Sequence, residues 1–168
     1  RVAQPPGGEE VNVMRLQELQ GIATEFQAEI LTATVGTMVS PALVLAVIAV
    51  ETSGVETAES AAGARGLMQL MPATVERFGV PDPFVAADNI QGGVAFLDVL
   101  MTAFDRDPLL VLAGYNAGES AVRTAGGVPD FPETRDYVPK VLATYALARG
   151  LCRTPPELIT DGCVFVVR

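Results

Sequence analysis

The carboxylates of this chain carry its most informative chemistry, because the sequence contains no histidine. That absence excludes the Ser-His-Asp and Cys-His nucleophile systems and every zinc site that uses imidazole. Glu51 follows nine consecutive apolar residues, 42–50, which leave no polar face on a helix. Burial and the negative end of the helix dipole would both disfavour its ionised form, so Glu51 is a candidate general acid. The alternative is a glutamate that emerges into solvent where the helix leaves the core.

The helix that ends at Glu51 is expected to begin at Ser40, a good cap, with Pro41 at its first position. Residues 52–64 are rich in Ser, Thr, Gly and Glu and predict a loop. Residues 1–8 predict a flexible entry segment. Before the buried helix, an amphipathic packing helix is expected over 9–31. Its apolar stripe would be formed by Val13, Leu16, Leu19, Ile22, Phe26 and Ile30.

The remainder of the chain also favours helices. Further helical segments are expected over residues 72–78, 89–104, 109–115, 120–124 and 133–149. Asp88 is expected to cap the second of these, and Asp107 with Pro108 to open the third. The tail 163–167 is strand-like but has no obvious partner in the chain. These patterns predict a mainly α fold in one compact domain.

Composition excludes several classes of protein. The 168 residues are 49% hydrophobic with mean hydropathy +0.35, which excludes a disordered chain. A net charge of −9 with 11 Lys plus Arg argues against nucleic-acid binding, which needs a basic patch. The nine-residue apolar run is about half of the roughly 18 residues of a membrane span, so we expect a soluble protein. Because the sequence begins at Arg1, a missing signal peptide does not place it in the cytoplasm.

The two cysteines, Cys152 and Cys163, flank a segment rich in proline and turn residues. An even count with a short intervening loop predicts a disulfide and an oxidising compartment. Two buried free thiols are the alternative.

Three further segments combine polar side chains with glycine turns: Gly66-Leu67-Met68-Gln69 with Ser60 before it, Gly114-Tyr115-Asn116-Ala117-Gly118, and Glu133-Thr134-Arg135-Asp136-Tyr137-Val138. With Glu51-Thr52, and in this order and spacing, they resemble the soluble, goose-lysozyme-like family of lytic transglycosylases over roughly residues 39–150. Two positions depart from the family pattern. Thr52 replaces the usual Ser and could narrow the pocket beside Glu51, and Gly114 replaces the usual Ala.

The resemblance implies a lysozyme-like helical domain that cleaves bacterial peptidoglycan without water and leaves a 1,6-anhydro muramyl end. It covers a catalytic domain over 39–150. Together with the helical pattern and the two cysteines, this predicts three parts: an N-terminal segment and packing helix (1–38), the catalytic domain (39–150) and a disulfide-linked tail (151–168). Glu51 would be the acid and then the base. The residues implied to contact the glycan are Ser60, Met68, Gln69, Tyr115, Asn116 and Tyr137.

The same resemblance implies neither a cofactor nor a metal. The expected partners are peptidoglycan glycan strands, and the expected state is a monomer in the periplasm or secreted from the cell. A role with secretion or conjugation machinery is compatible with the small size.

Structural alternatives stand beside several of these roles. Tyr115, Tyr137 and Met68 could simply fill the core, and Glu133 could act only as a favourable charge at a helix N-terminus. Two other functions are also compatible with the sequence. One is a goose-type lysozyme in which water attacks, and the other is a non-catalytic glycan-binding or assembly module.

Overall fold

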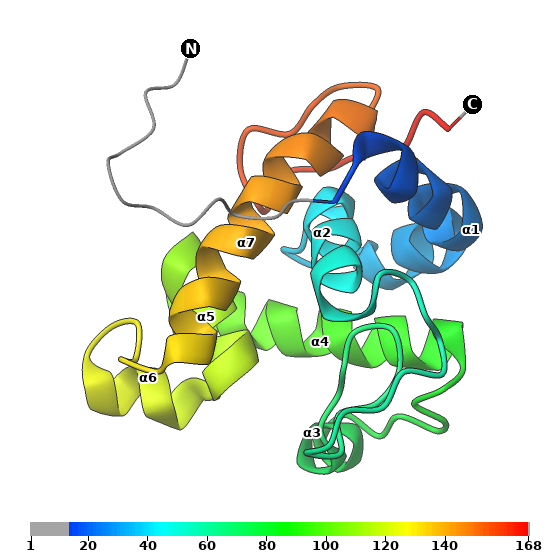
Figure 1. The fold of residues 1–168 in the computed structure, drawn as a ribbon. Coiled ribbons are helices and arrows are strands. Elements are labelled where there is room, and N and C mark those ends of the chain that lie inside the picture. Colours follow the sequence, from blue (N-terminus) through cyan, green and yellow to red (C-terminus); the bar gives the residue numbers. More distant parts are fainter. Residues whose placement is uncertain (1–13, 168) are drawn as a thin grey trace.

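The computed structural model describes residues 14–167 and is mainly helical, as predicted (Figure 1). Extended pairing within these residues is limited to isolated β-bridges. The α-helices are α1 (Leu16–Thr34), α2 (Pro41–Thr52), α3 (Pro72–Arg77), α4 (Ala86–Ala103), α5 (Pro108–Ala117), α6 (Glu119–Ala125) and α7 (Pro132–Ala148), followed by the 3-10 turn η1 (Arg149–Leu151).

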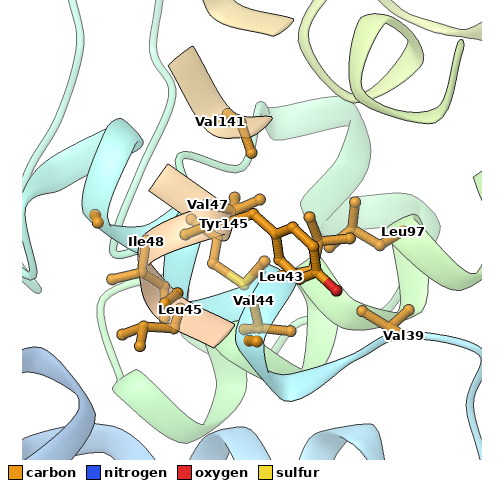
Figure 2. Close-up of a cluster of buried hydrophobic side chains, with 14 of the residues drawn as sticks. Val39, Leu43, Val44, Leu45, Val47, Ile48, Leu97, Val141 and Tyr145 are labelled. Atoms are coloured by element: carbon orange, nitrogen blue, oxygen red, sulfur yellow. The ribbon is translucent and has the colours of Figure 1, made fainter. Parts of the chain in front are cut away.

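Helix α2 occupies the centre of the molecule, where α1 and α7 pack against it (Figure 1). Ser40 caps it as expected, since its Oγ accepts from the Ala42 N–H at 3.3 Å. Residues 41–49 are all buried, which agrees with the absence of a polar face in the sequence. Figure 2 shows side chains of α2 packed with Val141 and Tyr145 of α7 and Leu97 of α4.

Helix α1 begins later than the sequence predicted. Arg15 precedes its first turn, and Glu18 accepts a hydrogen bond from the Arg15 N–H at 3.0 Å. The predicted stripe is buried from Leu19 onward, while Leu16 remains 49% exposed. The expectations for residues 1–8 and for Val13 lie outside the described residues.

The predicted start of α4 was wrong. The helix begins at Ala86, so Asp88 lies in its first turn instead of capping it. A turn closed by a hydrogen bond from the Val85 N–H to the Asp82 carbonyl (3.1 Å) starts the helix earlier. Asp107, by contrast, caps α5 as predicted, and its Oδ1 accepts from two backbone N–H groups of the first turn.

The C-terminal tail has a partner that the sequence did not reveal. Cys152 and Cys163 form the predicted disulfide, and Cys152 pairs with Phe165 in an antiparallel bridge. Beyond this bridge, the Ile159 carbonyl accepts a hydrogen bond from the Ser40 N–H at 2.9 Å. The tail therefore also contacts the residue that caps the central helix.

Across residues 14–167, none of the helices combines the length and the apolar character needed to cross a bilayer.

Candidate active site

Glu51 lies in the last turn of α2, half-buried, directly after the buried part of the helix. Burial raises the pKa of its carboxyl from 4.5 to about 7, and the negative charge of Glu133 acts in the same direction. The Tyr137 side chain lowers that pKa, but burial outweighs it. Near neutral pH the carboxyl is therefore divided between its acid and its base form.

Tyr137 and Tyr115 are both buried close to Glu51. The Glu51 charge raises the pKa of each phenol, after burial itself, which is the larger cause for both. The Tyr137 hydroxyl is close enough to the Glu51 carboxyl for a hydrogen bond to affect both pKa values, although the bond does not reach ideal geometry. Tyr137 therefore interacts with Glu51 while no other partner for its hydroxyl lies within residues 14–167.

Asn116 connects the end of α5 to the start of α7. Its Oδ1 accepts from the Thr134 hydroxyl at 2.8 Å, and its Nδ2 donates to Glu133 Oε1 at 3.3 Å. Glu133 stands in the first turn of α7, as the helix-terminus interpretation expected. Its negative charge also raises the pKa of Glu51, a role that the sequence alone did not reveal.

The Gly66–Gln69 loop is held against α2 and α5 through its backbone. The Thr52 hydroxyl donates to the Leu67 carbonyl at 2.8 Å, and the Tyr115 hydroxyl donates to the Met68 carbonyl at 2.7 Å. The hydroxyl of Thr52, at the position where Ser was expected, therefore holds α2 against this loop.

Gln69 closes this loop and links it to the segment before it. Its side-chain amide donates to the carbonyls of Gly66 (3.0 Å) and Ala58 (3.2 Å), and its φ is +52°, in the left-handed region. A non-glycine residue in this region is strained, and the amide hydrogen bonds hold it there.

Met68 itself belongs to the core. Its side chain has no exposed surface and packs so closely on Gly93 that a Cβ at that glycine would lie 2.4 Å from the sulfur. A side chain with no exposed atom offers no contact to a glycan in this conformation. The structure therefore favours the core-filling interpretation of Met68.

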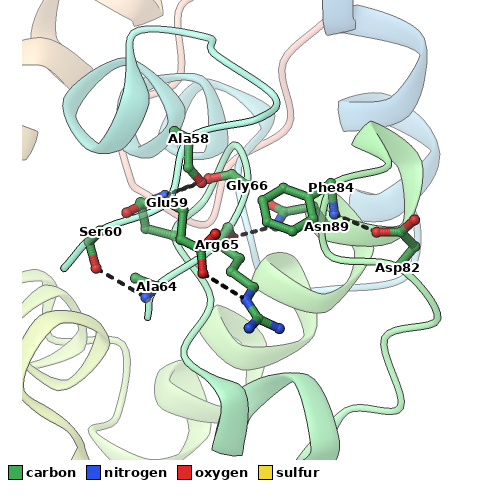
Figure 3. Close-up of polar contacts among 10 residues, drawn as sticks. Ala58, Glu59, Ser60, Ala64, Arg65, Gly66, Asp82, Phe84 and Asn89 are labelled. Atoms are coloured by element: carbon green, nitrogen blue, oxygen red, sulfur yellow. Dashed lines mark hydrogen bonds and ion pairs between the residues drawn. The ribbon is translucent and has the colours of Figure 1, made fainter. Parts of the chain in front are cut away.

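Ser60 is exposed and forms part of a turn. Its Oγ accepts from the Ala64 N–H at 3.0 Å, as Figure 3 shows. Among the predicted site residues, Glu51, Tyr115 and Tyr137 are brought together, and Asn116 joins them through Glu133. Ser60 makes its hydrogen bond within its own turn, whereas Gln69 bonds to Gly66 in its own loop and to Ala58 in the preceding segment.

Asn89 is a structural centre of the site that the sequence reasoning missed. It is fully buried, its Oδ1 accepts from the Met68 N–H at 2.8 Å, and its Nδ2 donates to the Pro83 carbonyl. The same Nδ2 also donates to the Arg65 carbonyl (Figure 3). A Cβ at Gly66 would lie 2.3 Å from that Nδ2. The sequence presented Asn89 only as the first residue of a helix, and nothing in its neighbours signalled these distant partners.

A cavity of about 560 Å³ lies beside the last turn of α2, but it does not include Glu51. Ala49, Val50 and Ser53 line it, together with Arg15 and Lys140. None of the predicted site residues lines this cavity. Nor do residues 14–167 contain a group of three or more Cys, Asp or Glu side chains that could hold a metal ion. The candidate site is therefore defined by side-chain chemistry around Glu51.

A carboxyl whose pKa is raised by burial, held by a helical domain, is the kind of acid that lysozyme-like glycosidases use. Residues 29–138 match the family model described as the transglycosylase SLT domain, and the chain belongs to this family.

Known relatives share this fold. The soluble lytic murein transglycosylase of Salmonella typhimurium is 31% identical over 152 residues, covering 77% of this chain and 24% of the relative. The structure of the 70-kDa soluble lytic transglycosylase of Escherichia coli superposes with a TM-score of 0.70 at 26% identity, covering 83% of this chain and 27% of the other.

A third relative concerns the catalytic chemistry. The structure of an inactive Glu-to-Gln mutant of the lytic transglycosylase Slt from Pseudomonas aeruginosa superposes with a TM-score of 0.67 at 28% identity, covering 80% of this chain and 25% of the other. This chain thus spans about a quarter of the length of each of these three proteins.

Proposed function

We propose that this protein is a lytic transglycosylase that cleaves the β-1,4 bond between N-acetylmuramic acid and N-acetylglucosamine in peptidoglycan. The observation that carries the proposal is the Glu51 carboxyl, whose pKa of about 7 suits both donation and acceptance of a proton near neutral pH. The family membership of the chain supports the choice of substrate.

The reaction would proceed in two balanced steps. Glu51 donates its proton to the glycosidic oxygen while the muramyl N-acetyl oxygen bonds to the anomeric carbon and the glycosidic bond breaks. The resulting Glu51 carboxylate then accepts the proton of the 6-hydroxyl. The 6-oxygen bonds to the anomeric carbon and releases the N-acetyl oxygen, leaving a 1,6-anhydro end. One carboxyl suffices because the substrate supplies both nucleophiles.

The remaining site residues would orient the sugar and the developing charge. Asn116, half-buried beside Glu133, and Gln69, half-buried in its loop, present amide groups of the kind that bind N-acetyl and hydroxyl groups. The Tyr137 hydroxyl lies beside Glu51 and would hold its carboxyl in place. Tyr115 would hold the Met68 carbonyl, and with it the Gly66–Gln69 loop, in place. Ser60, on its exposed turn, would contact the glycan.

The second candidate function is a goose-type lysozyme, in which water replaces the 6-hydroxyl. One observation favours it: Glu133 is a second carboxylate whose charge reaches Glu51. Against it, Glu133 already accepts a hydrogen bond from Asn116. A non-catalytic glycan-binding module would have no need for the raised pKa of Glu51.

Mass spectrometry of the muropeptides released from purified sacculi separates these functions. We expect anhydro ends, lighter than reducing ends by one water, and no incorporation of heavy oxygen from labelled water. Labelled reducing ends would establish the lysozyme instead. Binding to sacculi without release of muropeptides would establish the module.

We further propose that the protein acts as a monomer in the periplasm or outside the cell, and that it opens the wall for secretion or conjugation machinery. The disulfide supports an oxidising compartment. The division into parts at residues 38 and 150 stays a prediction.

A further inference from the structure

Arg77, the last residue of α3, links that helix to α6. Its Nη1 donates to Glu119 Oε1 at 2.7 Å across 42 residues of sequence. Both are short helices, visible at the lower edge of the molecule in Figure 1. Helix α3 contributes no buried residue, and α6 contributes only Val122. Because so little packing holds either helix, a direct link between them matters more than a similar pair elsewhere.

The same guanidinium lies over an aromatic row that leads inward. Its central carbon is 5.0 Å from the Phe78 ring centroid and 5.9 Å from that of Phe96. The Phe96 ring in turn lies 5.3 Å from the ring of Tyr115, whose hydroxyl binds the Met68 carbonyl. Stacking on rings restricts the planar guanidinium, so less freedom is lost when it pairs with Glu119.

Glu119 stands at a turn next to the candidate site. It is the first residue of α6 and directly follows Gly118, whose φ of +92° separates α5 from α6. Asn116 lies two residues before that glycine and makes the hydrogen bonds to Glu133 and Thr134. An anchor at Glu119 therefore restrains the turn that follows Asn116.

On the α3 side, the polypeptide runs directly from the Gly66–Gln69 loop through Leu70 and Met71 into Pro72, the first residue of α3. The Arg77–Glu119 pair thus joins the helix that follows Gln69 to the helix that follows Asn116.

We propose that Arg77 and Glu119 are a positioning pair, which fixes the distance between the Gln69 and Asn116 sides of the site and thereby sets its affinity for the glycan. The inference rests on the proposed function. Neither residue is among the groups that shift the Glu51 pKa, so the pair should act on substrate binding and leave proton transfer unchanged.

The competing explanation is an ordinary surface ion pair, since such pairs often contribute nothing measurable. The chain offers a matched control for it. Arg135 and Asp130 form an ion pair whose side chains are 65% and 88% exposed, compared with 50% and 23% for Arg77 and Glu119. Asp130→Asn and Glu119→Gln each remove one carboxylate charge from an arginine pair without changing side-chain size.

The kinetic test uses the full chain and solubilised peptidoglycan strands. Glu119→Gln and Arg77→Gln are each expected to raise KM about 3- to 10-fold with kcat within about twofold, the pattern of lost uniform binding. The double variant should lose no more than either single variant, because both remove the same link. Arg77→Lys keeps the charge but loses the planar stacking, and should be intermediate. Asp130→Asn should match the wild type.

A KM for Glu119→Gln equal to that of Asp130→Asn would overturn the proposal, as would multiplicative losses in the double variant. Amide hydrogen exchange followed by mass spectrometry gives a second readout that needs no activity. The backbone amides of residues 66–71 and 116–119 should both exchange faster in Glu119→Gln than in Asp130→Asn. Equal exchange rates in the two variants would overturn the positioning role of the Arg77–Glu119 pair. Absence of anhydro product from the wild type would reject the proposed function alone, because the exchange result stands independently.

Discussion

Glu133 and Tyr137 lie four residues apart, one turn of α7, and act on the Glu51 carboxyl in opposite directions. The Glu133 charge raises the Glu51 pKa, and the Tyr137 side chain lowers it. Burial of Glu51 outweighs both and sets the value near 7. One helix therefore adjusts the proton affinity of a carboxyl that another helix buries.

The first prediction concerns the acid itself. Glu51→Gln is expected to lose about two to four orders of magnitude in rate, because general acid catalysis contributes roughly that much. Clearing of a peptidoglycan suspension measures the loss, and circular dichroism checks that the variant is folded. A folded variant that clears at nearly the wild-type rate would exclude Glu51 as the acid.

The second prediction concerns pH. The rate should fall as pH rises through about 7, since the acid form of Glu51 is lost there. Glu133→Gln removes a charge that raises this pKa and should move the alkaline limb to lower pH. Tyr137→Phe removes a group that lowers the pKa and should move the limb to higher pH. Rates measured between pH 5 and pH 9 test the two directions together, and shifts of the same sign would contradict the assignment.

The third prediction concerns stability. Because the folded-state pKa of Glu51 is raised from 4.5 to about 7, the folded protein favours the protonated form. The stability of the wild type should therefore decrease as pH rises from 4.5 through 7, by at most about 3 kcal/mol. Glu51→Gln lacks this loss and should melt at a higher temperature than the wild type at pH 8. Thermal melts at pH 4 and pH 8 provide the measurement, with Glu76→Gln, at an exposed position of α3, as control.

The fourth prediction concerns the tail. The Cys152–Cys163 disulfide closes a short loop, with a sequence separation of 11. Its removal in Cys152→Ser/Cys163→Ser should cost roughly 3 kcal/mol on the chain-entropy estimate. Urea unfolding of the double variant and the oxidised wild type measures the difference. Equal midpoints would show that the tail docks without help from the bridge.

The fifth prediction concerns Asn89. Asn89→Ala leaves the Met68 N–H and the Arg65 and Pro83 carbonyls without this partner, and should destabilise the protein by about 2 to 4 kcal/mol. Gln91→Ala, at an exposed position on the same helix, should be nearly neutral. Denaturant unfolding measures the free energy of unfolding of both variants. A loss for Asn89→Ala as small as that for Gln91→Ala would contradict this structural role of Asn89.

The parts of the structure that the sequence predicted well depend on local patterns. The nine apolar residues before Glu51 required a buried helix, and Ser40 and Asp107 cap their helices through neighbouring backbone groups. The raised pKa of Glu51 follows from the same local burial.

The parts that the sequence could not predict depend on partners far along the chain. Phe165 pairs with Cys152, Asn89 binds Met68, and Arg77 reaches Glu119. The same limit applies to Met68, whose burial is decided by its close contact with Gly93 in α4. Side-chain identity alone does not specify such contacts.

The raised pKa of Glu51, in a chain without histidine, makes proton counting by calorimetry practical. Binding of a neutral oligosaccharide over the carboxyl should displace water and draw a proton from the buffer. The heat of binding then depends on the ionisation enthalpy of the buffer chosen. The difference in this buffer dependence between the wild type and Glu51→Gln gives the number of protons that the Glu51 carboxyl takes up on binding, before any bond is broken.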